Sequence, residues 1–250
     1  MKAIINEYIS KKSGWLTFSL MKGEDIVVST KFEGLDSFQY LMEYLDTSDL
    51  DLKAIDWVNC DCKGKGLDYL VKFENIKTVS IQGFSESILP DLSKLKKLET
   101  IHFNQTRGQL TLTNLSSSQS IKKLYFGDFT FGKAVEIRDF NEILKCKSLE
   151  ELFLSNANFP ETELDKLKHL KTLKKLTINQ KYSFERLAEL SIILSDIECN
   201  EFRAWSPCDS SFGDVKINGK RKPYLNSKID RDKIKKYELE FEELKKNYAK

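Results

Sequence analysis

Few residues in this chain of 250 amino acids have the types and spacing that catalysis or metal binding requires. Histidine occurs only at His102 and His169, and neither lies at a metal-ligand spacing from Cys, Asp or Glu. Cys60 and Cys62 are one residue closer together than a redox or zinc pair, and no second pair completes a site. The sequence therefore predicts no metal site and no bound cofactor.

Two further patterns favour a structural role over catalysis. Gly64-Lys65-Gly66 is shorter than a phosphate-binding loop, so it is interpreted as a turn. Asp56, Ser80 and His102 are expected on one sheet face, but a nucleophile needs its base within hydrogen-bond reach. An open sheet also offers no pocket that excludes water. The sequence predicts a protein that is not an enzyme.

The elements that position these residues are predicted from a repeated pattern: apolar, two variable, apolar, one variable, apolar. Its seven copies start 24, 22, 23, 28, 24 and 21 residues apart. They are Leu52-Ile55-Trp57, Ile76-Val79-Ile81, Leu98-Ile101-Phe103, Ile121-Leu124-Phe126, Leu149-Leu152-Leu154, Leu173-Leu176-Ile178 and Leu194-Ile197-Cys199. A period of this length is typical of a solenoid, in which each repeat adds one parallel strand to a curved sheet.

Over about 150 of the 250 residues the pattern resembles the leucine-rich repeat family. The resemblance implies an α/β fold, a leucine-rich repeat solenoid with a parallel concave sheet and a mostly helical convex side. The chain departs from the family at the position that usually holds Asn or Cys. That position is occupied by Cys60, Phe84, Thr106, Phe129, Ala157, Lys181 and Phe202. The missing Asn ladder favours a divergent, bacterial-type array.

The solenoid is expected over residues 49–205, with additional segments at both ends. Residues 1–48 are interpreted as an N-terminal β/α cap: a strand at 16–20, a return strand from Ile26, a further strand at 3–9 and a helix at 35–45. Within the solenoid, the return segment 135–144 is predicted to be a full helix. Residues 204–212 are predicted to form a loop.

Residues 206–250 are predicted to form a C-terminal hairpin and helix. Asn218-Gly219 is typical of a tight turn, and Asp230 is a suitable N-cap for the helix. The helix carries an apolar stripe of Ile234, Tyr237, Phe241, Leu244 and Tyr248, which must be buried. It is expected to cap the last repeat; dimerisation through this helix, or binding of another partner, is the alternative.

The exposed sheet face follows from the alternation of side chains along a strand. Its central column is expected to contain Asp56, Ser80, His102, Tyr125, Phe153, Thr177 and Glu198, and the next column begins with Val58, Gln82 and Asn104. Aromatic rings flanked by amides and charges are typical of interface hot spots. The predicted protein-binding residues are His102, Tyr125, Phe153, Asn104, Gln82, Asn179, Asp56 and Glu198. Packing of these rings against a loop of the chain itself is the alternative.

Charged residues alternate in sign from one repeat to the next and are expected to fix the strand register. They are Lys77, Glu99, Lys122-Lys123, Glu150-Glu151, Lys174-Lys175 and Asp196. The whole chain has a net charge of +2, but residues 215–250 carry +6 and the remainder −4. Nucleic-acid binding is therefore considered only for this tail, where Lys220-Arg221-Lys222 is the densest basic segment.

The cysteine count and the apolar pattern favour a cytoplasmic protein. Five cysteines cannot all pair, the first residues lack an apolar signal region, and no apolar run is long enough to span a membrane. Taken together, the sequence predicts a non-catalytic module that binds another protein through its concave sheet. A toxin-neutralising immunity protein of bacterial type is the alternative, and nucleic-acid binding through the tail is a third.

Overall fold

The computed structural model describes residues 16–22, 25–32, 52–61, 67–82, 89–104, 109–127, 134–179 and 181–249. The chain divides into two compact units, residues 1–150 with 156–159 and residues 151–155 with 160–250. The domain boundaries expected after residues 48 and 205 stay predictions. The strand expected at 3–9 and the helix expected at 35–45 lie outside the described residues.

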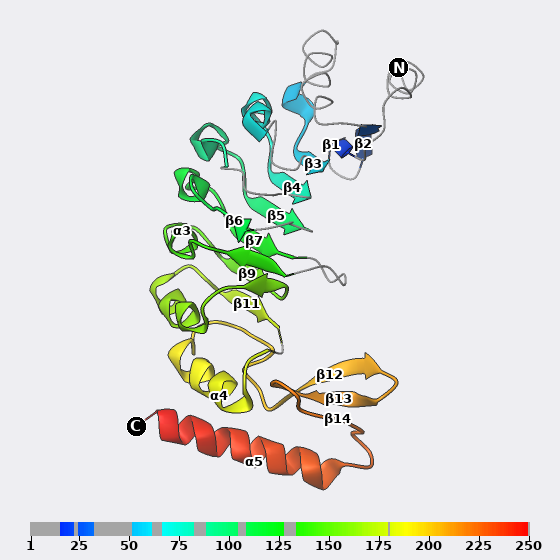
Figure 1. The fold of residues 1–250 in the computed structure, drawn as a ribbon, viewed down its shortest axis with the longest axis vertical. Coiled ribbons are helices and arrows are strands. Elements are labelled where there is room, and N and C mark those ends of the chain that lie inside the picture. Colours follow the sequence, from blue (N-terminus) through cyan, green and yellow to red (C-terminus); the bar gives the residue numbers. More distant parts are fainter. Residues whose placement is uncertain are drawn as a thin grey trace. The chain divides into compact units, whose positions relative to one another are not determined.

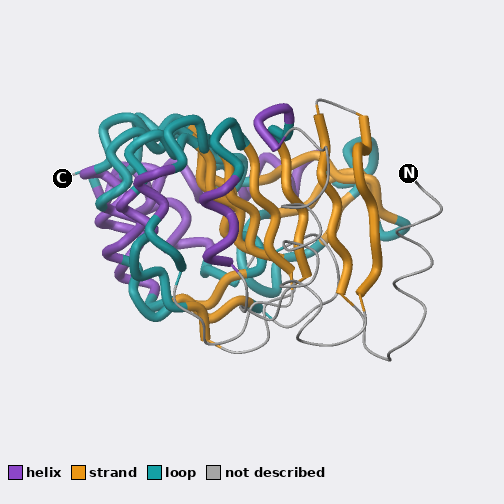
Figure 2. The backbone as a smooth tube through the Cα atoms, turned by 90° about the horizontal axis from the view of Figure 1, so that it is seen from above, coloured by secondary structure: helices purple, strands orange, loops and turns teal. Residues whose placement is uncertain are grey.

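The first unit contains a sheet whose central strands are parallel. These are β3 (Trp57–Asp61), β4 (Thr78–Gln82), β5 (Thr100–Asn104) and β7 (Lys123–Phe126), paired in that order. The antiparallel hairpin of β1 (Leu16–Lys22) and β2 (Asp25–Phe32) extends the sheet, because β1 also pairs with β3. Figure 2 shows these strands side by side. The predicted parallel strands and N-terminal hairpin are confirmed here.

Burial of the apolar positions explains why each repeat adds one strand. Val79, Ile101, Leu124 and their partners two residues later, Ile81, Phe103 and Phe126, are all at most 2% exposed. The rings of Phe103 and Phe126 stack with their centroids 5.1 Å apart. Removing each such side chain from water stabilises the fold by roughly 1.5–3 kcal/mol. The continuous core between neighbouring strands therefore dictates the parallel register.

The first repeat has a different phase from the predicted one. Val58 pairs with Val79 and is fully buried, as is Ile55, whereas Trp57 is 37% exposed. The apolar pattern is therefore Ile55-Val58-Cys60, three residues later than Leu52-Ile55-Trp57. Ile55 satisfies both frames in sequence, and only the pairing with the second repeat separates them.

The return segments of the first unit are mostly short 3-10 helices (Figure 1). They are η1 (Leu52–Ala54), η2 (Leu67–Lys72), η3 (Leu92–Lys94) and η4 (Leu115–Ser117). The full helix predicted for 135–144 is wrong. Val135 and Ile137 are buried on either side of exposed Glu136, which is the period of a strand, and α3 covers only Asn141–Leu144.

A second, smaller parallel sheet accounts for that strand. It joins β6 (Gln109–Leu110), β8 (Val135–Ile137) and β10 (Ala157–Asn158) within the first unit. Polar side chains also link successive return segments. The Asn114 amide donates to the Leu89 carbonyl at 2.8 Å, and the Ser120 hydroxyl donates to the Leu98 carbonyl at 2.7 Å. These bonds satisfy carbonyl groups that would otherwise lack partners beside a buried core.

The second unit combines two parallel strands, two helical segments, a small antiparallel sheet and a final helix. Strands β9 (Glu151–Leu154) and β11 (Lys175–Ile178) pair in parallel, with η5 (Glu161–His169) between them in sequence. Helix α4 (Phe184–Ile193) begins at Ser183, whose hydroxyl accepts from the Arg186 N–H at 3.1 Å. The sheet order is β12 (Trp205–Ser210), β13 (Gly213–Ile217) and β14 (Tyr224–Leu225).

Two C-terminal predictions are wrong at this sheet. The segment predicted to be a loop contains β12, and a six-residue loop over 218–223 replaces the tight turn expected at Asn218-Gly219. The cause is Asn218, which is fully buried. Its amide donates to the main-chain carbonyls of Asn200 and Arg203, so it holds the chain before β12 and does not turn a hairpin.

Helix α5 (Arg231–Tyr248) confirms the predicted C-terminal helix, which packs against α4. Of its apolar stripe, Ile234 and Phe241 are buried, whereas Tyr248 is 44% exposed. The Phe184 ring lies edge-on to the rings of Phe241 and Tyr237, with centroids 5.2 and 5.8 Å apart. The Lys222 ammonium lies 4.4 Å from the Phe184 centroid, which is a cation–π contact. Asp230 precedes the helix, but its carboxylate accepts from the Asn226 N–H instead of capping it.

Candidate functional site

The parallel strands of the first unit present one face whose side chains form rows across the sheet. Strand pairing places Trp57, Thr78, Thr100 and Lys123 in one row, and Asn59, Ser80, His102 and Tyr125 in the next. A third row contains Asp61, Gln82 and Asn104. We call these three rows the sheet face. The side chains of Asn59, Asp61 and Gln82 lie outside the described part.

The middle row of the sheet face contains a stacked pair of rings on β5 and β7. His102 pairs with Tyr125 across the strands, and their ring planes are 7° apart with centroids at 4.4 Å. Both side chains are partly exposed, so one side of the stack remains accessible. The predicted adjacency of these two residues is confirmed. Ring stacking pre-orders both side chains, which reduces the conformational entropy that binding a partner would cost.

Hydrogen bonding fixes the polar neighbour of this stack. The Asn104 amide donates to the Ser80 hydroxyl at 3.3 Å, and the Ser80 side chain is only 6% exposed. Asn104 itself is partly exposed and retains its carbonyl oxygen as an acceptor. The structure therefore places the Asn104 amide, held by its hydrogen bond to Ser80, beside His102 on the same strand.

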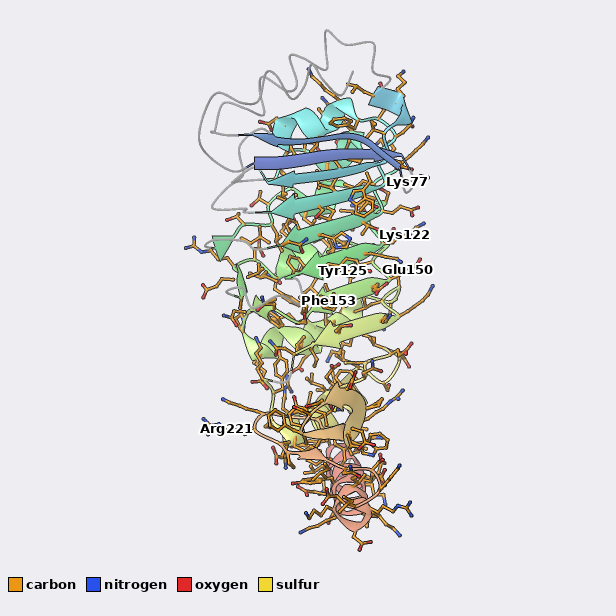
Figure 3. All side chains as sticks on the ribbon, turned by 90° about the vertical axis from the view of Figure 1, so that its right-hand side faces the viewer. Lys77, Lys122, Tyr125, Glu150, Phe153 and Arg221 are labelled. Carbon is orange, nitrogen blue, oxygen red and sulfur yellow. The ribbon has the colours of Figure 1, made fainter. Side chains whose placement is uncertain are left out.

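A row of alternating charges borders the sheet face at the start of its strands. Asp56, Lys77, Glu99 and Lys122 are neighbours in register, and the Glu150 N–H donates to the Lys122 carbonyl. Figure 3 shows Lys77, Lys122 and Glu150 along one edge of the strands. The Lys122 ammonium lies 2.7 Å from the Glu99 carboxylate, which raises the lysine pKa. The predicted cross-strand pairing is confirmed here. In the second unit, the main chain of Lys175 pairs with that of Glu198 in an isolated β-bridge, and not with Asp196.

Several predicted site residues lie elsewhere. Phe153 belongs to the second unit, pairs with Thr177 and is only 7% exposed, so the exposed ring predicted there is wrong. Asp56 faces Lys77 and is absent from the central row, because the first repeat starts three residues later than predicted. Val58, expected on the exposed side, is buried in the core for the same reason.

The two remaining predicted residues also lie in the second unit. The main-chain β-bridge between Glu198 and Lys175 places Glu198 two positions away from its expected partner Thr177. The Asn179 side chain accepts from the Lys181 N–H at 3.1 Å, so it stabilises a turn. Neither residue joins the rows of the sheet face.

Sequence reasoning missed Trp57, which lies on the sheet face with 37% of its surface exposed. It was assigned to the core because tryptophan fits the apolar position of the pattern. Its signal was available: the frame Ile55-Val58-Cys60 fits the repeat equally well and leaves Trp57 at a variable position. Tryptophan and tyrosine are the residues most enriched at interface hot spots.

Burial lowers the pKa of the His102 imidazole below its ordinary value of 6.5. Because the unfolded chain then binds the proton more readily than the folded one, stability from this group is present above about pH 6.5 and declines as the pH falls below it. Near neutral pH the stack therefore contains a neutral imidazole.

We expect a pH-dependent loss of stability that depends on His102. Between pH 7.5 and 5.5, both chosen to bracket the ordinary histidine pKa of about 6.5, the wild-type chain should lose more unfolding free energy than His102→Gln. Urea titrations at the two pH values measure this difference. His169→Gln, at an exposed histidine outside the sheet face, is the control variant. Equal pH dependence in the wild type and His102→Gln would contradict the burial argument.

Two of the described cysteines, Cys146 and Cys199, are buried. Burial raises the pKa of the Cys146 thiol to about 12. Burial also raises the pKa of Cys199, whose thiol donates to the Glu201 carboxylate at 3.2 Å. The thiolate is the reactive form, so both groups are inert near neutral pH. Across the described ranges no three His, Cys, Asp or Glu side chains group closely enough to hold a metal ion.

Among the described helices, none combines the length and the apolar character needed to cross a membrane.

No protein-family model matches the chain, and no curated protein matches it. Among solved structures, the chain is similar to an internalin C2 from Listeria monocytogenes. The identity is 15%, the match covers 59% of this chain and 71% of that chain, and the TM-score is 0.33. So distant a likeness carries no conclusion about fold or function.

Proposed function

We propose that this chain is a non-catalytic, leucine-rich-repeat-type module that binds another protein through the sheet face of its first unit. The observation that carries the proposal is the His102–Tyr125 stack, held in parallel at 4.4 Å in the middle row of that face. A pair of pre-ordered, partly exposed rings supplies apolar contact area at low entropic cost.

The surroundings of the stack support a protein partner. Trp57 adds a third ring in the neighbouring row, and the Asn104 amide offers a fixed hydrogen-bonding group. The Lys122–Glu99 pair and the rest of the alternating charges form a polar border. An apolar centre with a mixed polar rim is the usual anatomy of a protein–protein interface. A nucleic acid would instead require charges of one sign.

The contacts of His102 and the burial of two thiols support the non-catalytic part of the proposal. His102 is the one histidine of the sheet face, and its cross-strand neighbours are Ser80 on one side and Tyr125 on the other. The imidazole stacks on the Tyr125 ring, and the hydrogen bond of the Ser80 hydroxyl is with the Asn104 amide and not with His102, whereas a catalytic base would bond to its nucleophile. Buried, protonated thiols at Cys146 and Cys199 supply no alternative nucleophile.

Affinity capture of partners, followed by mass spectrometry, tests the proposal. Tyr125→Ala should reduce recovery of the main captured protein by roughly 30-fold or more, the effect of removing a hot-spot ring. The matched control is Tyr224→Ala, which removes an exposed tyrosine (41%) from β14 in the second unit and should leave capture unchanged. Melting curves of both variants must stay close to the wild type.

The result that would overturn the proposal is equal capture of the same protein by wild type and Tyr125→Ala. A large loss of stability in Tyr125→Ala would also count against it, because it would show that the ring serves the core. Trp57→Ala provides a second, independent variant on the same face, with the same expected direction.

A further inference from the structure

Helix α5 has a second face that the fold does not use. Its inner side packs Ile234, Tyr237 and Phe241 toward α4. Leu239 lies on the opposite side of the helix, since successive residues are rotated by about 100°. It is 65% exposed. An isolated exposed leucine is ordinary, but the charges around this one follow a pattern.

The charges change sign across Leu239 along the helix. Lys235 and Lys236 precede it, and Glu242 and Glu243 follow it at equal distances in sequence. Asp232 and Lys246 lie one further turn out on either side, with opposite signs again. All six side chains are exposed and fall within roughly 60° of the direction of Leu239. We call these seven residues the outer face of α5.

This outer face is complementary to itself when one copy is reversed. In an antiparallel pair with its two-fold axis at Leu239, Lys235 faces Glu243 and Lys236 faces Glu242. Asp232 then faces Lys246, and the two leucines meet at the axis. A parallel pair would instead place like charges opposite each other. A two-fold interface requires the same patch on both copies to match itself, and only the antiparallel arrangement does so.

Most of these charges are not engaged within the helix. Over residues 181–249 the structure records no ion pair for Asp232, Lys235, Lys236, Glu243 or Lys246. The ion pairs on α5 are Lys233 with Asp230 and Lys245 with Glu242, so only Glu242 would share its carboxylate. The alternative is a solvated face whose charges form ion pairs with one another at i,i+4 spacing. The structure does not record such pairs among these residues.

We propose that the chain self-associates through the outer face of α5, which pairs antiparallel with the same face of a second copy. This goes beyond the function proposed for the sheet face, because it uses residues of the second unit alone. The outer face lies on a helix of 18 residues, which is about 27 Å long. Both signs of charge on it argue against a nucleic acid or an anionic membrane, which attract one sign. Exposed ion pairs are screened by salt, so the association is expected to be weak and salt-sensitive.

Sedimentation equilibrium of the full chain at low ionic strength tests this pairing. Two charge-reversal variants are compared with the wild type: Lys235→Glu with Lys236→Glu, and Glu242→Lys with Glu243→Lys. The first makes the outer face mainly acidic and the second mainly basic. Each variant alone should self-associate roughly tenfold or more weakly than the wild type, since like charges then face each other. All four positions are exposed, so far-UV circular dichroism should be unchanged.

Mixing the two variants provides the decisive measurement. An equal mixture should form a heterodimer, and a chain that carries all four reversals should regain the wild-type association, because its pattern is again self-complementary. High salt should weaken both species. A wild-type chain that stays monomeric at every concentration at low salt would overturn the proposal. So would a dimer that neither variant weakens, or a mixture that does not associate.

Discussion

Replacing Phe184 with alanine is expected to lower the free energy of unfolding by about 3–5 kcal/mol. The side chain is 1% exposed, and its ring packs against α5. Its loss removes ring contacts with both Phe241 and Tyr237 and leaves a cavity that two rigid helices cannot close. The Lys222 ammonium also loses the ring over which it lies. Urea denaturation followed by circular dichroism measures the change.

The matched control is Phe212→Ala, at a phenylalanine that is 80% exposed in the turn between β12 and β13. It should change the unfolding free energy by no more than about 0.5 kcal/mol. If Phe184→Ala behaved like this control, the packing of α5 on α4 would contribute little, and the buried stripe of the helix would need another explanation.

The parallel strands were predictable because one residue pattern determines both burial and register. Val79, Ile101 and Leu124 occupy the same position of successive repeats, and strands with one buried face cannot slip by a residue without exposing such side chains. The adjacency of His102 and Tyr125 follows from that register. The same reasoning failed at the first repeat, where Ile55 fits two frames and only the neighbouring strand decides between them.

The candidate site was less predictable than the strands. Trp57 and Val58 exchanged faces because of the phase of one repeat, so the sequence placed an exposed tryptophan in the core. Phe153 occupies the same pattern position as Tyr125, but it is buried. Position in a repeat specifies which way a side chain points, whereas exposure also depends on what covers it. That second quantity is not local in sequence.

The C-terminal segment was mispredicted for a different reason. Asn218-Gly219 is a strong local signal for a tight turn, yet the Asn218 side chain bonds to carbonyl groups 15 and 18 residues earlier. Gly219 does adopt a positive φ of 108°, and a Cβ there would lie 3.1 Å from the Phe184 nitrogen. The dipeptide was thus correctly expected to be special, but its role is tertiary and no local pattern reveals the partners.

Replacing Asn218 with leucine, which has nearly the same size, should cost about 2–5 kcal/mol of unfolding free energy. The side chain is fully buried, and its amide donates at 3.1 Å to the Asn200 carbonyl and at 3.0 Å to the Arg203 carbonyl. Leucine removes the donor of the Arg203 carbonyl, leaves the Asn200 carbonyl with only the Ser206 hydroxyl at 3.3 Å, and removes the bonds between Asn218 and that hydroxyl. Each buried unsatisfied group costs roughly 1–3 kcal/mol. Chemical denaturation of the purified chain at neutral pH measures the loss.

Asn218→Asp sharpens the test because it keeps the shape and removes the donors. Its carboxylate would face two carbonyl oxygens in a buried site, so at neutral pH it should be at least as destabilising as leucine. Lowering the pH should recover part of that loss, since a protonated carboxyl regains one donor. Asn247→Ala, at an exposed asparagine of α5, is the matched control and should change stability by less than about 0.5 kcal/mol. If Asn218→Leu matched this control, the loop 218–223 would be held by its backbone bonds, such as that from the Asn218 N–H to the Ala204 carbonyl, and not by the buried amide.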